Sequence, residues 1–586
     1  MHTFEIWAPE ARTVEVKIAE KSFPLTKREG GWWMAEVATA GPGTDYAFVV
    51  NGEEPALPDP RSPWQPKGVH GPSRLFNLAA WNDGKASDGK WTDDGWRPRS
   101  LEKAILYELH LGTFTPEGTL EAAESRLEYL ADLGITHIEL MPVATFAGDR
   151  GWGYDGVDLY APHCAYGGPA ALLHFINACH GAGLGVLLDV VYNHFGPMGN
   201  YLPKFAPYLT GNHVTPWGDA VNLEEAESDG VRRFFIDNAL MWLRDYHFDG
   251  LRLDAVHALV DRSAIHFLEQ LAAEVHHLGL SLGKDLVVIA ESDLNDPRLV
   301  WATDAGGYGL DAQWSDDFHH ALFTVLTGEK QGYYEDFGSL ADLAKALEKT
   351  FVYDDVYSRF RKRHHGRPAQ GLPGHRFLGY IQNHDQVGNR AKGERLGQIV
   401  SLGRAKIAAA IVLTSPFIPL LFQGEEFGAS TPFQYFTGYE DAEMGRLVSA
   451  GRKREFAAFG WKPEEIPDPQ DRETFERSKL RWEELAESPH REMLAWYKKL
   501  IKLRQRLADL SSGAPGSTRV RYDEQARWLI VERSRARVLC NLGSESVRLE
   551  TGGRPELLLA SDESVAVDEK GIALGPDAAA IILVAG

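Results

Sequence analysis

The spacing of hydrophobic and polar positions changes twice along the chain and divides it into three parts. Residues 1–95 contain short runs that are apolar or alternate with polar residues, separated by turns rich in Gly, Pro and Glu. Such runs are typical of β-strands, and here they predict a small β-sandwich. Near the end of the chain a turn region is followed by similar short runs. These runs predict a second small β-domain over residues 514–586.

The middle part, residues 96–513, alternates strand-like apolar runs with helix-like runs. Near-continuous apolar strands such as GVLLDVV (185–191) and LVVIAES (286–292) suit a parallel sheet that is buried on both faces. About eight strand candidates can be counted if AQWSDDFHH (312–320) is one of them, and eight is the number that closes a barrel. An open doubly wound sheet is the alternative, but the chain has neither GxGxxG nor GxxxxGK[ST]. We therefore expect an α/β fold, a (β/α)8 TIM barrel flanked by two β-domains.

Composition limits the partners. The 586 residues include 61 Lys and Arg against 83 Asp and Glu, a net charge of −22. A strongly acidic surface repels polyanions, so we expect no nucleic-acid partner and no anionic membrane surface. A neutral substrate is unaffected by this charge. The chain also has 16 Trp, 20 Tyr and 27 Phe, whose rings stack on apolar faces such as those of sugars, although most belong to the core.

Cysteine usage and the N-terminus indicate the compartment. The three cysteines are too few and too scattered for a disulfide framework or a zinc site, which fits a reducing environment. The N-terminal MHTFEIWAPEART lacks a basic stretch followed by an apolar run, so no signal peptide is predicted. Residues 407–422 are apolar but interrupted by Pro416 and Pro419, and too short to span a bilayer. We expect a cytoplasmic protein without a cofactor.

Acidic residues end or follow apolar strands of the predicted barrel at four places. They are Asp189, Asp254, Glu291 and Asp385. A charge beside an apolar run is costly unless it is paired or lies in a site, and the carboxyl ends of barrel strands form the active-site face. One such residue is more often a helix cap or half of a buried ion pair, but four together predict an active site. The same strand ends carry Asn193, His194, Arg252, His257 and His384.

This set of side chains suits cleavage of a glycosidic bond, in which one carboxylate attacks the anomeric carbon and a second carboxyl protonates the leaving oxygen. Arg252 precedes Asp254 by two residues, so both point to one side of a strand, and the guanidinium would keep Asp254 ionised. Glu291 follows the apolar run VVIA, where burial would keep it protonated. The alternatives are a buried salt bridge between Arg252 and Asp254, or a metal site. No HExxH or paired-histidine spacing supports the metal site.

Four segments resemble, in the right order, the conserved regions of the α-amylase family of glycoside hydrolases. They are DVVYNH (189–194), GLRLDAVH (250–257), AES (290–292) and QNHDQ (382–386). The resemblance implies a (β/α)8 barrel and a retaining mechanism through a covalent glycosyl-enzyme. It also implies that Asp254 is the nucleophile, Glu291 the general acid/base, and Asp385 a third carboxylate that holds sugar hydroxyls and stabilises the transition state.

The resemblance also implies a substrate site around these carboxylates. His194, Arg252 and His384 would contact the sugar or the nucleophile, and Tyr154, in GWGYDGVDLYAP (151–162), would stack under the sugar. Many α-amylases bind calcium through the asparagine that matches Asn193. The acidic ligands that accompany it cannot be identified in this sequence, so we expect no metal.

Further segments resemble one branch of the family, whose members hydrolyse the α-1,4 bond next to the terminal trehalose of maltooligosyltrehalose. They are residues 215–224, 315–322, 383–390, 454–461 and 468–482. The products would be trehalose and a maltooligosaccharide. The implied additional substrate-binding residues are Leu253, Ala255, Val256, His257, Asp316, Asp317, Phe318, His319, His320, Gln386, Val387, Gly388 and Asn389. Alternatively, the histidines of DDFHH end a strand and cap a neighbouring helix.

Two other functions remain open. A glycogen branching enzyme shares the N-terminal β-domain, the barrel and the four regions, but passes the glycosyl group to a sugar hydroxyl instead of water. The catalytic carboxylates do not separate the two; the segments named above favour the hydrolase. A non-catalytic glucan-binding protein is less expected, because all three carboxylates are present. Trp32, Trp33 and Trp64 of the first β-domain could bind glucan or pack on the barrel.

Overall fold

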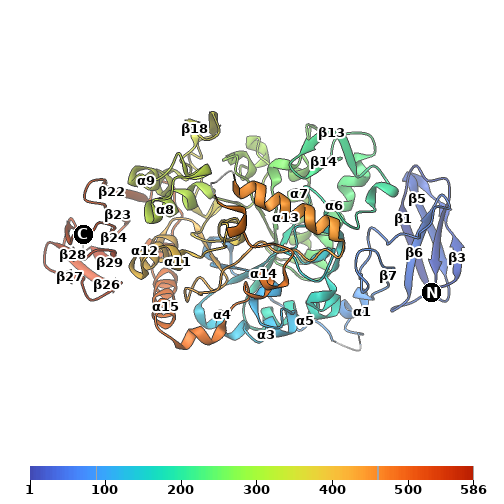
Figure 1. Cartoon of the computed structure of the whole chain (residues 1–586), viewed down its shortest axis with the longest axis horizontal. Coiled ribbons are helices and arrows are strands. Elements are labelled where there is room, and N and C mark those ends of the chain that lie inside the picture. The colour runs from blue at the N-terminus through green and yellow to red at the C-terminus, as the bar shows by residue number, and fades with distance from the viewer. Residues whose placement is uncertain (87–88, 458–460, 585–586) are drawn as a thin grey trace.

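The computed structural model describes residues 1–86, 89–457 and 461–584. The chain forms an elongated molecule in which a central barrel separates an N-terminal β-domain at one end from a C-terminal β-domain at the other (Figure 1). In the described ranges, no helix combines the length and apolar character needed to cross a membrane.

The central part is a closed barrel of eight parallel strands that follow one another around the barrel in chain order. They are β8 (Leu106–Leu109), β9 (His137–Leu140), β12 (Gly185–Val190), β15 (Gly250–Leu253), β16 (Val287–Ala290), β17 (Ala312–Trp314), β20 (Phe377–Gly379) and β21 (Ile418–Phe422). The predicted (β/α)8 barrel is confirmed. Because all strands run in the same direction, their carboxyl ends meet on one face of the barrel. The acidic residues that end or follow these strands therefore lie at that face.

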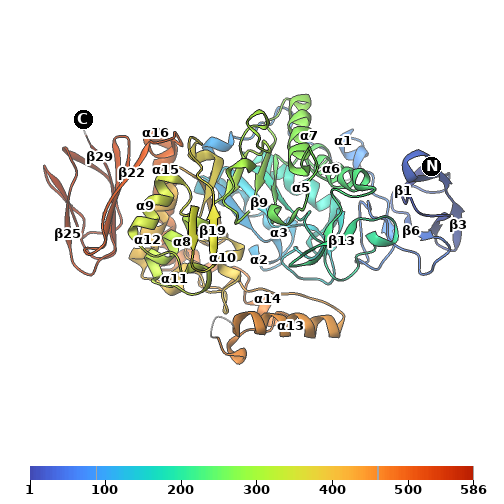
Figure 2. The same cartoon turned by 90° about the horizontal axis from the view of Figure 1, so that it is seen from above.

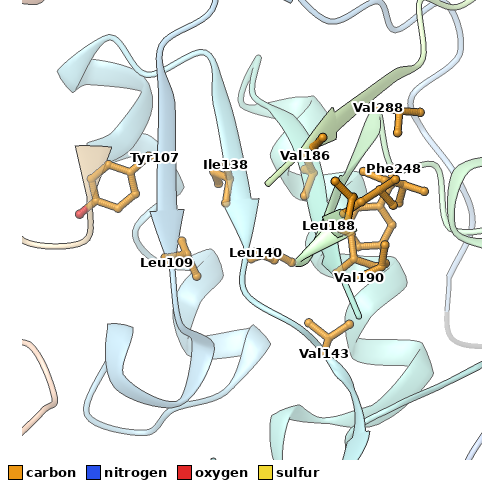
Figure 3. Packing of buried hydrophobic residues seen from close by; sticks show 14 of the residues in the cluster. Tyr107, Leu109, Ile138, Leu140, Val143, Val186, Leu188, Val190, Phe248 and Val288 are labelled. Atoms are coloured by element: carbon orange, nitrogen blue, oxygen red, sulfur yellow. The ribbon is translucent and has the colours of Figure 1, made fainter. Parts of the chain in front are cut away.

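Side chains alternate between the inside and the outside of the barrel, as strand geometry requires. Leu106, Leu187 and Leu420 belong to an apolar cluster that fills the interior. Their neighbours on the strands face outward into the larger core beneath the helices, where Figure 3 shows Ile138, Leu140, Val186, Leu188 and Val190, among others. Two residues beyond Leu187, Asp189 therefore points back into the interior, just above the apolar layer.

The predicted crossover helices are present, with two local differences. They include α5 (Gly168–Gly181), α6 (Ser228–Arg244), α7 (Phe267–Leu282), α8 (Asp316–Thr327) and α15 (His490–Arg506). The helix-like run TLEAAESRLEYLADLG (119–134) predicts a single helix, but the structure has two, α3 (Leu120–Glu124) and α4 (Leu127–Leu133). The hydroxyl of Ser125 donates to the Ala122 carbonyl between them, a local bond that competes with a continuous helix.

The segment 312–320 is not the single strand that the sequence predicts. The strand β17 ends at Trp314, and α8 begins at Asp316, so DDFHH is the first turn and a half of a helix. Two acidic residues in the first helical turn are favourable beside the positive end of the helix dipole.

Antiparallel sheets form both ends of the molecule, which confirms the predicted β-domains. The N-terminal sheets have the strand orders β1–β5–β4 and β3–β2–β6–β7, built from β1 (His2–Trp7), β2 (Val14–Ile18), β3 (Lys21–Pro24), β4 (Thr26–Lys27), β5 (Trp32–Val37), β6 (Asp45–Val50) and β7 (Ser73–Arg74). The C-terminal sheets have the orders β22–β23–β24–β29–β26 and β25–β28–β27, built from β22 (Thr518–Asp523), β23 (Trp528–Arg533), β24 (Ala536–Asn541), β25 (Val547–Glu550), β26 (Pro555–Ala560), β27 (Ala566–Val567), β28 (Gly571–Leu574) and β29 (Ala578–Val584). The division at 95/96 and 513/514 remains a prediction.

The tryptophans of the N-terminal domain take part in packing. Trp33 is buried and donates from its indole to the Ala8 carbonyl. The Arg61 guanidinium lies over the Trp32 ring and forms an ion pair of 2.9 Å with Asp237 on α6. Arg74 lies over Trp64. Arg61 therefore links this domain to the barrel, and these rings have packing roles that account for their presence.

Three long excursions surround the carboxyl ends of the strands. They are the hairpin β13–β14 (Leu209–Thr215, Gly218–Val221), the hairpin β18–β19 (Asp354–Ser358, Arg363–Gly366) and helix α13 (Ala442–Ala457). Helix α13 crosses the front of the barrel in Figure 1 and lies outside it in Figure 2. These excursions place residues distant in sequence near the strand ends.

Candidate active site

Two carboxyl groups from neighbouring barrel strands share one arginine. Asp254 directly follows β15, and Glu291 directly follows β16. The guanidinium of Arg252, which is fully buried, donates to Asp254 Oδ1 at 2.9 Å and lies 3.7 Å from Glu291 Oε2. Asp254 Oδ2 accepts a second bond from Asn193 Nδ2 at 2.8 Å. Both donors suit an ionised carboxylate, which only accepts hydrogen bonds.

Glu291 has a different environment from Asp254. Burial, together with the negative charges of Asp254, Asp316 and Asp385, raises the pKa of Glu291 to about 8 against the opposing charge of Arg252. Its Oε2 accepts from the backbone N–H of Ala255 at 2.6 Å, and Ala255 has the left-handed backbone conformation, with φ of 41°. Glu291 therefore holds a proton at neutral pH, next to a carboxylate suited to ionisation. Neighbouring carboxyls with such divergent environments can divide acid and nucleophile roles.

A third carboxylate, Asp385, lies beside a histidine. The Nε2 atom of His384 is 3.4 Å from Asp385 Oδ2, and Asn389 Nδ2 donates to Asp385 Oδ1 at 3.0 Å. Burial would raise the pKa of Asp385, but the charge and hydrogen bond of His384 outweigh it and lower this pKa to about 2. The Asp385 side chain is 42% exposed, so it is an ionised group that faces an approaching ligand.

Asp189 supports the other residues from below. It accepts two bonds of 2.8 Å from Arg252 Nη1 and one of 2.6 Å from the Tyr154 hydroxyl. Its side chain is only 1% exposed, and burial raises its pKa to about 6 despite Arg252. The Tyr154 ring stacks on His384, with centroids 5.0 Å apart. Asp189 thus orients Arg252 and Tyr154 and does not face the open side of the site.

His194 links the backbone of Tyr154 to the β13–β14 excursion. Its Nε2 contacts the Tyr154 carbonyl at 3.0 Å, and its Nδ1 contacts Asn193 Oδ1. The ring stacks on Trp217 of the β13–β14 excursion, with centroids 4.8 Å apart and planes within 7°. Trp217 is 47% exposed and offers a flat apolar face at the edge of the site.

The structure brings only part of residues 316–320 to this group. Asp316 Oδ1 accepts from the Tyr380 hydroxyl at 2.6 Å and from Gln386 Nε2 at 3.2 Å. Its negative charge is among those that raise the pKa of Glu291. Asp316 and Gln386 therefore adjoin the carboxylates, and their contact with substrate stays a prediction.

The other four residues of DDFHH point elsewhere. Asp317 Oδ2 accepts the backbone N–H groups of Val352 and Tyr353, each at 2.7 Å, and so anchors the chain before β18. The remaining three are buried: Phe318 packs on Phe417, His319 Nε2 contacts the Tyr334 hydroxyl at 3.1 Å, and His320 stacks on Tyr333. These residues shape the wall behind the site. They belong to α8 itself, so they do not cap a neighbouring helix.

The remaining predicted residues mostly form the supporting layer. Leu253, Val256 and Val387 are buried apolar side chains. Gly388 allows close packing, because a Cβ atom there would lie 2.1 Å from the Trp152 ring. His257 is exposed at the rim.

Three functional-site neighbours were missed by the sequence interpretation. Trp217 lies within the segment 215–224, which resembles one branch of the family. An aromatic ring in such a segment is a signal from which a sugar contact could have been predicted. Arg452 on α13 donates to the Gly388 carbonyl and, at 3.2 Å, to Asn389 Oδ1. Glu108 at the end of β8 binds His384 through both carboxylate oxygens. Nothing local in the sequence links Arg452 or Glu108 to the site.

Asn193 donates to the backbone carbonyl and the carboxylate of Asp254, each at 2.8 Å. Within the residues that the structure describes, no three or more His, Cys, Asp or Glu side chains gather in a way that could hold a metal ion.

Comparison with known proteins agrees with this geometry. Residues 81–206 match the family model for the α-amylase catalytic domain, and residues 514–581 match a domain of unknown function, DUF3459. A solved structure from Salmonella typhimurium, provisionally described as an α-amylase, superposes with a TM-score of 0.90 at 38% identity, covering 100% of this chain and 97% of that one. The barrel and its paired carboxylates define a glycosidase of the α-amylase family.

Full-length relatives identify the branch. Malto-oligosyltrehalose trehalohydrolase from Rhizobium sp. (strain M-11) is 48% identical over 587 residues, covering 99% of this chain and 97% of that protein. The branching enzyme GlgB of Geobacillus stearothermophilus is only 28% identical, covering 72% of this chain and 67% of the enzyme. The chain belongs to the malto-oligosyltrehalose trehalohydrolase family.

Proposed function

We propose that this chain hydrolyses the α-1,4-glucosidic bond next to the terminal trehalose of maltooligosyltrehalose, with retention of configuration. The products are trehalose and a maltooligosaccharide. The substrate is supported by the names of the full-length relatives. The observation that carries the chemistry is the pairing of Asp254 with a protonated Glu291 around one buried guanidinium.

In this mechanism Asp254 attacks the anomeric carbon of the glucose unit that precedes trehalose. Glu291 gives its proton to the glycosidic oxygen, so trehalose leaves as a neutral alcohol. A covalent glycosyl-enzyme remains on Asp254. Glu291, now ionised, takes a proton from water as the water attacks the same carbon, which restores both carboxyl groups and releases the maltooligosaccharide.

The surrounding residues hold the sugar at the cleaved bond. Asp385 is ionised and open to the site, so it can accept hydrogen bonds from sugar hydroxyls and stabilise positive charge that develops on the ring. His384 stacks on the Tyr154 ring, and His194 contacts the Tyr154 backbone carbonyl. In this proposal the Tyr154 ring stacks under the sugar. Arg252 holds Asp254 in position for attack.

Further substrate contacts are proposed beside Asp385, from Asp316, Gln386 and Asn389. Gln386 lies next to Asp385 in α10 (His384–Gly388) and donates to Asp316, and Asn389, just after this helix, donates to Asp385.

The cytoplasmic location also stays a proposal, supported by the free Cys164, Cys179 and Cys540.

Product analysis tests this function against its rival. Purified protein is incubated with maltotriosyltrehalose in one reaction and with amylose in another. We expect trehalose to be released from the first and no new α-1,6 bonds in the second. Loss of iodine staining with new α-1,6 bonds in amylose, and no trehalose from the capped substrate, would mean that the chain is a branching enzyme.

A further inference from the structure

Two glutamates lie inside the barrel, below the carboxylates already described. Glu108 on β8 and Glu139 on β9 are direct neighbours in the parallel register. Each side chain points inward, and each residue is 1% exposed. They have the same chemistry and nearly the same place in the barrel, but their partners are different.

Glu108 is fully engaged with His384. Its Oε2 accepts the backbone N–H of His384 at 2.8 Å, and its Oε1 lies 2.5 Å from the ring Nδ1. One carboxylate therefore holds both the backbone and the ring of the histidine, which leaves the ring only one orientation.

The hydrogen bonds of Tyr154 define the protonation of that ring. The single hydroxyl proton of Tyr154 is donated to Asp189 Oδ2 at 2.6 Å. The contact of 2.8 Å between the same hydroxyl and His384 Nε2 then requires an N–H on Nε2. Because Nδ1 faces the Glu108 carboxylate, both ring nitrogens carry protons, and His384 is an imidazolium.

Glu139 has no such partner. Neither of its carboxylate oxygens has a hydrogen-bond partner in the described part of the chain. Burial, followed by the charge of Glu108, raises the pKa of Glu139 far above its ordinary value, although Arg252 and His384 oppose the shift. Two carboxyl groups this close in a dry interior do not both ionise, and only Glu108 has donors that stabilise a negative charge.

We propose that Glu108 is a positioning residue that keeps His384 oriented and protonated beside Asp385, while its neighbour Glu139 holds a proton and stays neutral. Glu108 touches no reacting atom. It acts through His384, whose charge keeps Asp385 ionised. The ionisable groups that interact with His384 are Glu108 (β8), Glu139 (β9), Asp189 (β12), Asp385 (α10), His110 and Tyr154. This inference rests on the proposed hydrolase function.

The test compares Glu108→Gln with Glu139→Gln, the same substitution on adjacent strands. In Glu108→Gln the imidazolium loses a counter-charge and deprotonates at lower pH. We expect kcat on maltotriosyltrehalose to fall on the order of 10- to 100-fold, by analogy with the loss caused by removing a carboxylate that orients a metal-ligating histidine. In wild type the alkaline limb of the pH profile belongs to Glu291, whose pKa is about 8, and His384 loses its proton at higher pH. In Glu108→Gln we expect the pKa of His384 to fall below that of Glu291, so the midpoint of the alkaline limb should move to lower pH. Glu139→Gln should keep the wild-type profile, since the side chain it replaces is already neutral.

A lowered kcat with an unmoved alkaline limb in Glu108→Gln would show that Glu108 acts only through packing, which overturns the proposal. A shifted limb in Glu139→Gln would show that Glu139 carries the charge, which also overturns it. Glu108→Asp keeps the charge and should return the limb toward its wild-type position while kcat stays reduced.

If Glu108→Gln does not fold, NMR of ¹⁵N-histidine-labelled wild-type protein decides the question, with His384→Gln identifying the signal. Two protonated ring nitrogens on His384 at neutral pH support the proposal, and a neutral ring overturns it. The NMR result does not depend on the substrate. A wild-type protein that releases no trehalose would therefore refute the proposed function without deciding this inference.

Discussion

Pairs of carboxyl groups follow barrel strands at two places, and the two pairs differ in their exposure and in the side chains that bind them. Asp254 and Glu291 follow β15 and β16, share Arg252 and keep side chains that are 12% and 16% exposed. Glu425 and Glu426 follow β21 by a few residues and are 3% and 0% exposed. The Tyr497 hydroxyl donates to Glu425 at 2.8 Å, and the Tyr129 hydroxyl donates to Glu426 at 2.8 Å.

The second pair shows that an elevated pKa does not by itself identify a catalytic acid. Burial raises the pKa of Glu425 to about 8, the same value that Glu291 reaches, and the pKa of Glu426 to about 7. Tyrosine donors and the core enclose Glu425 and Glu426, so no substrate can reach them. Glu291 differs by its opening to solvent and by the neighbouring Asp254, which accepts hydrogen bonds from Arg252 and Asn193.

The largest expected effect is that of Asp254→Ala, which removes the proposed nucleophile. Since a retaining mechanism forms a bond to this carboxylate, the barrier should rise by several kcal/mol, about a thousandfold or more in kcat. Steady-state hydrolysis of maltotriosyltrehalose measures it. A variant with near-normal rate would refute the nucleophile role. The matched change at the other pair, Glu425→Ala, should impair folding instead of chemistry.

Removing the proton donor should have the next largest effect. Glu291→Gln keeps the shape but cannot protonate the leaving trehalose, so kcat should fall by about 10²- to 10⁴-fold. The wild-type rate should be constant from neutral pH up to about 8 and then fall as Glu291 loses its proton. The residual rate of Glu291→Gln should lack this alkaline limb. If the limb persists unchanged in the variant, another group is the acid.

A smaller effect is expected where the enclosed pair loses a donor. Tyr129→Phe removes the 2.8 Å hydrogen bond to Glu426 without creating a large cavity. The free energy of unfolding should fall by about 1–3 kcal/mol, the cost of leaving a buried acceptor less satisfied. Chemical denaturation measures this loss, and kcat should stay within about twofold of wild type, because Glu426 takes no part in the reaction. A large loss of kcat with normal stability would show that the two carboxylate pairs are functionally coupled.

The smallest effect is expected for Glu425→Gln at about pH 5, close to the unfolded-state pKa, and this effect should grow as the pH rises toward 8. The folded-state pKa of about 8 lies above the unfolded value of 4.5, so the folded state binds the extra proton between these values. Wild-type stability contributed by this group therefore falls as pH rises from about 4.5 to 8. A neutral glutamine removes that loss, so the variant should gain stability relative to wild type across this range. Paired denaturation curves at pH 5 and 8 test the sign, and a parallel pH dependence would contradict it.

Much of the fold could be predicted because local patterns and global structure agree. Near-continuous apolar strands such as Val186–Val190 fit only a sheet covered on both faces, and β12 is central in the barrel. The segment 312–320 was harder. Its apolar start continues into a helix whose buried side chains, among them Phe318 and His319, do not follow an amphipathic pattern. Burial on all sides removes the periodicity that distinguishes helix from strand.

The residues of the site also fall into those that could be predicted from the sequence and those that could not. Arg252, Asp254 and Glu291 are each recognisable from a position at a strand end, and the structure places them within one hydrogen-bonded group. Glu139 is also on an apolar strand, but its neutral state depends on Glu108, 31 residues earlier in the chain. Arg452 and Trp217 reach the site from excursions whose paths no local pattern specifies.

The amino-acid sequence alone determined the barrel, the β-domains at its ends, and which strands deliver carboxyl groups to one face, since strand direction and side-chain alternation are local properties. The tertiary structure decided which of those groups are open to a substrate and which are enclosed. It also decided which ones hold protons, because burial and the charges of distant residues determine pKa values. Glu291 and Glu425 are the clearest case, with equal pKa values and opposite access.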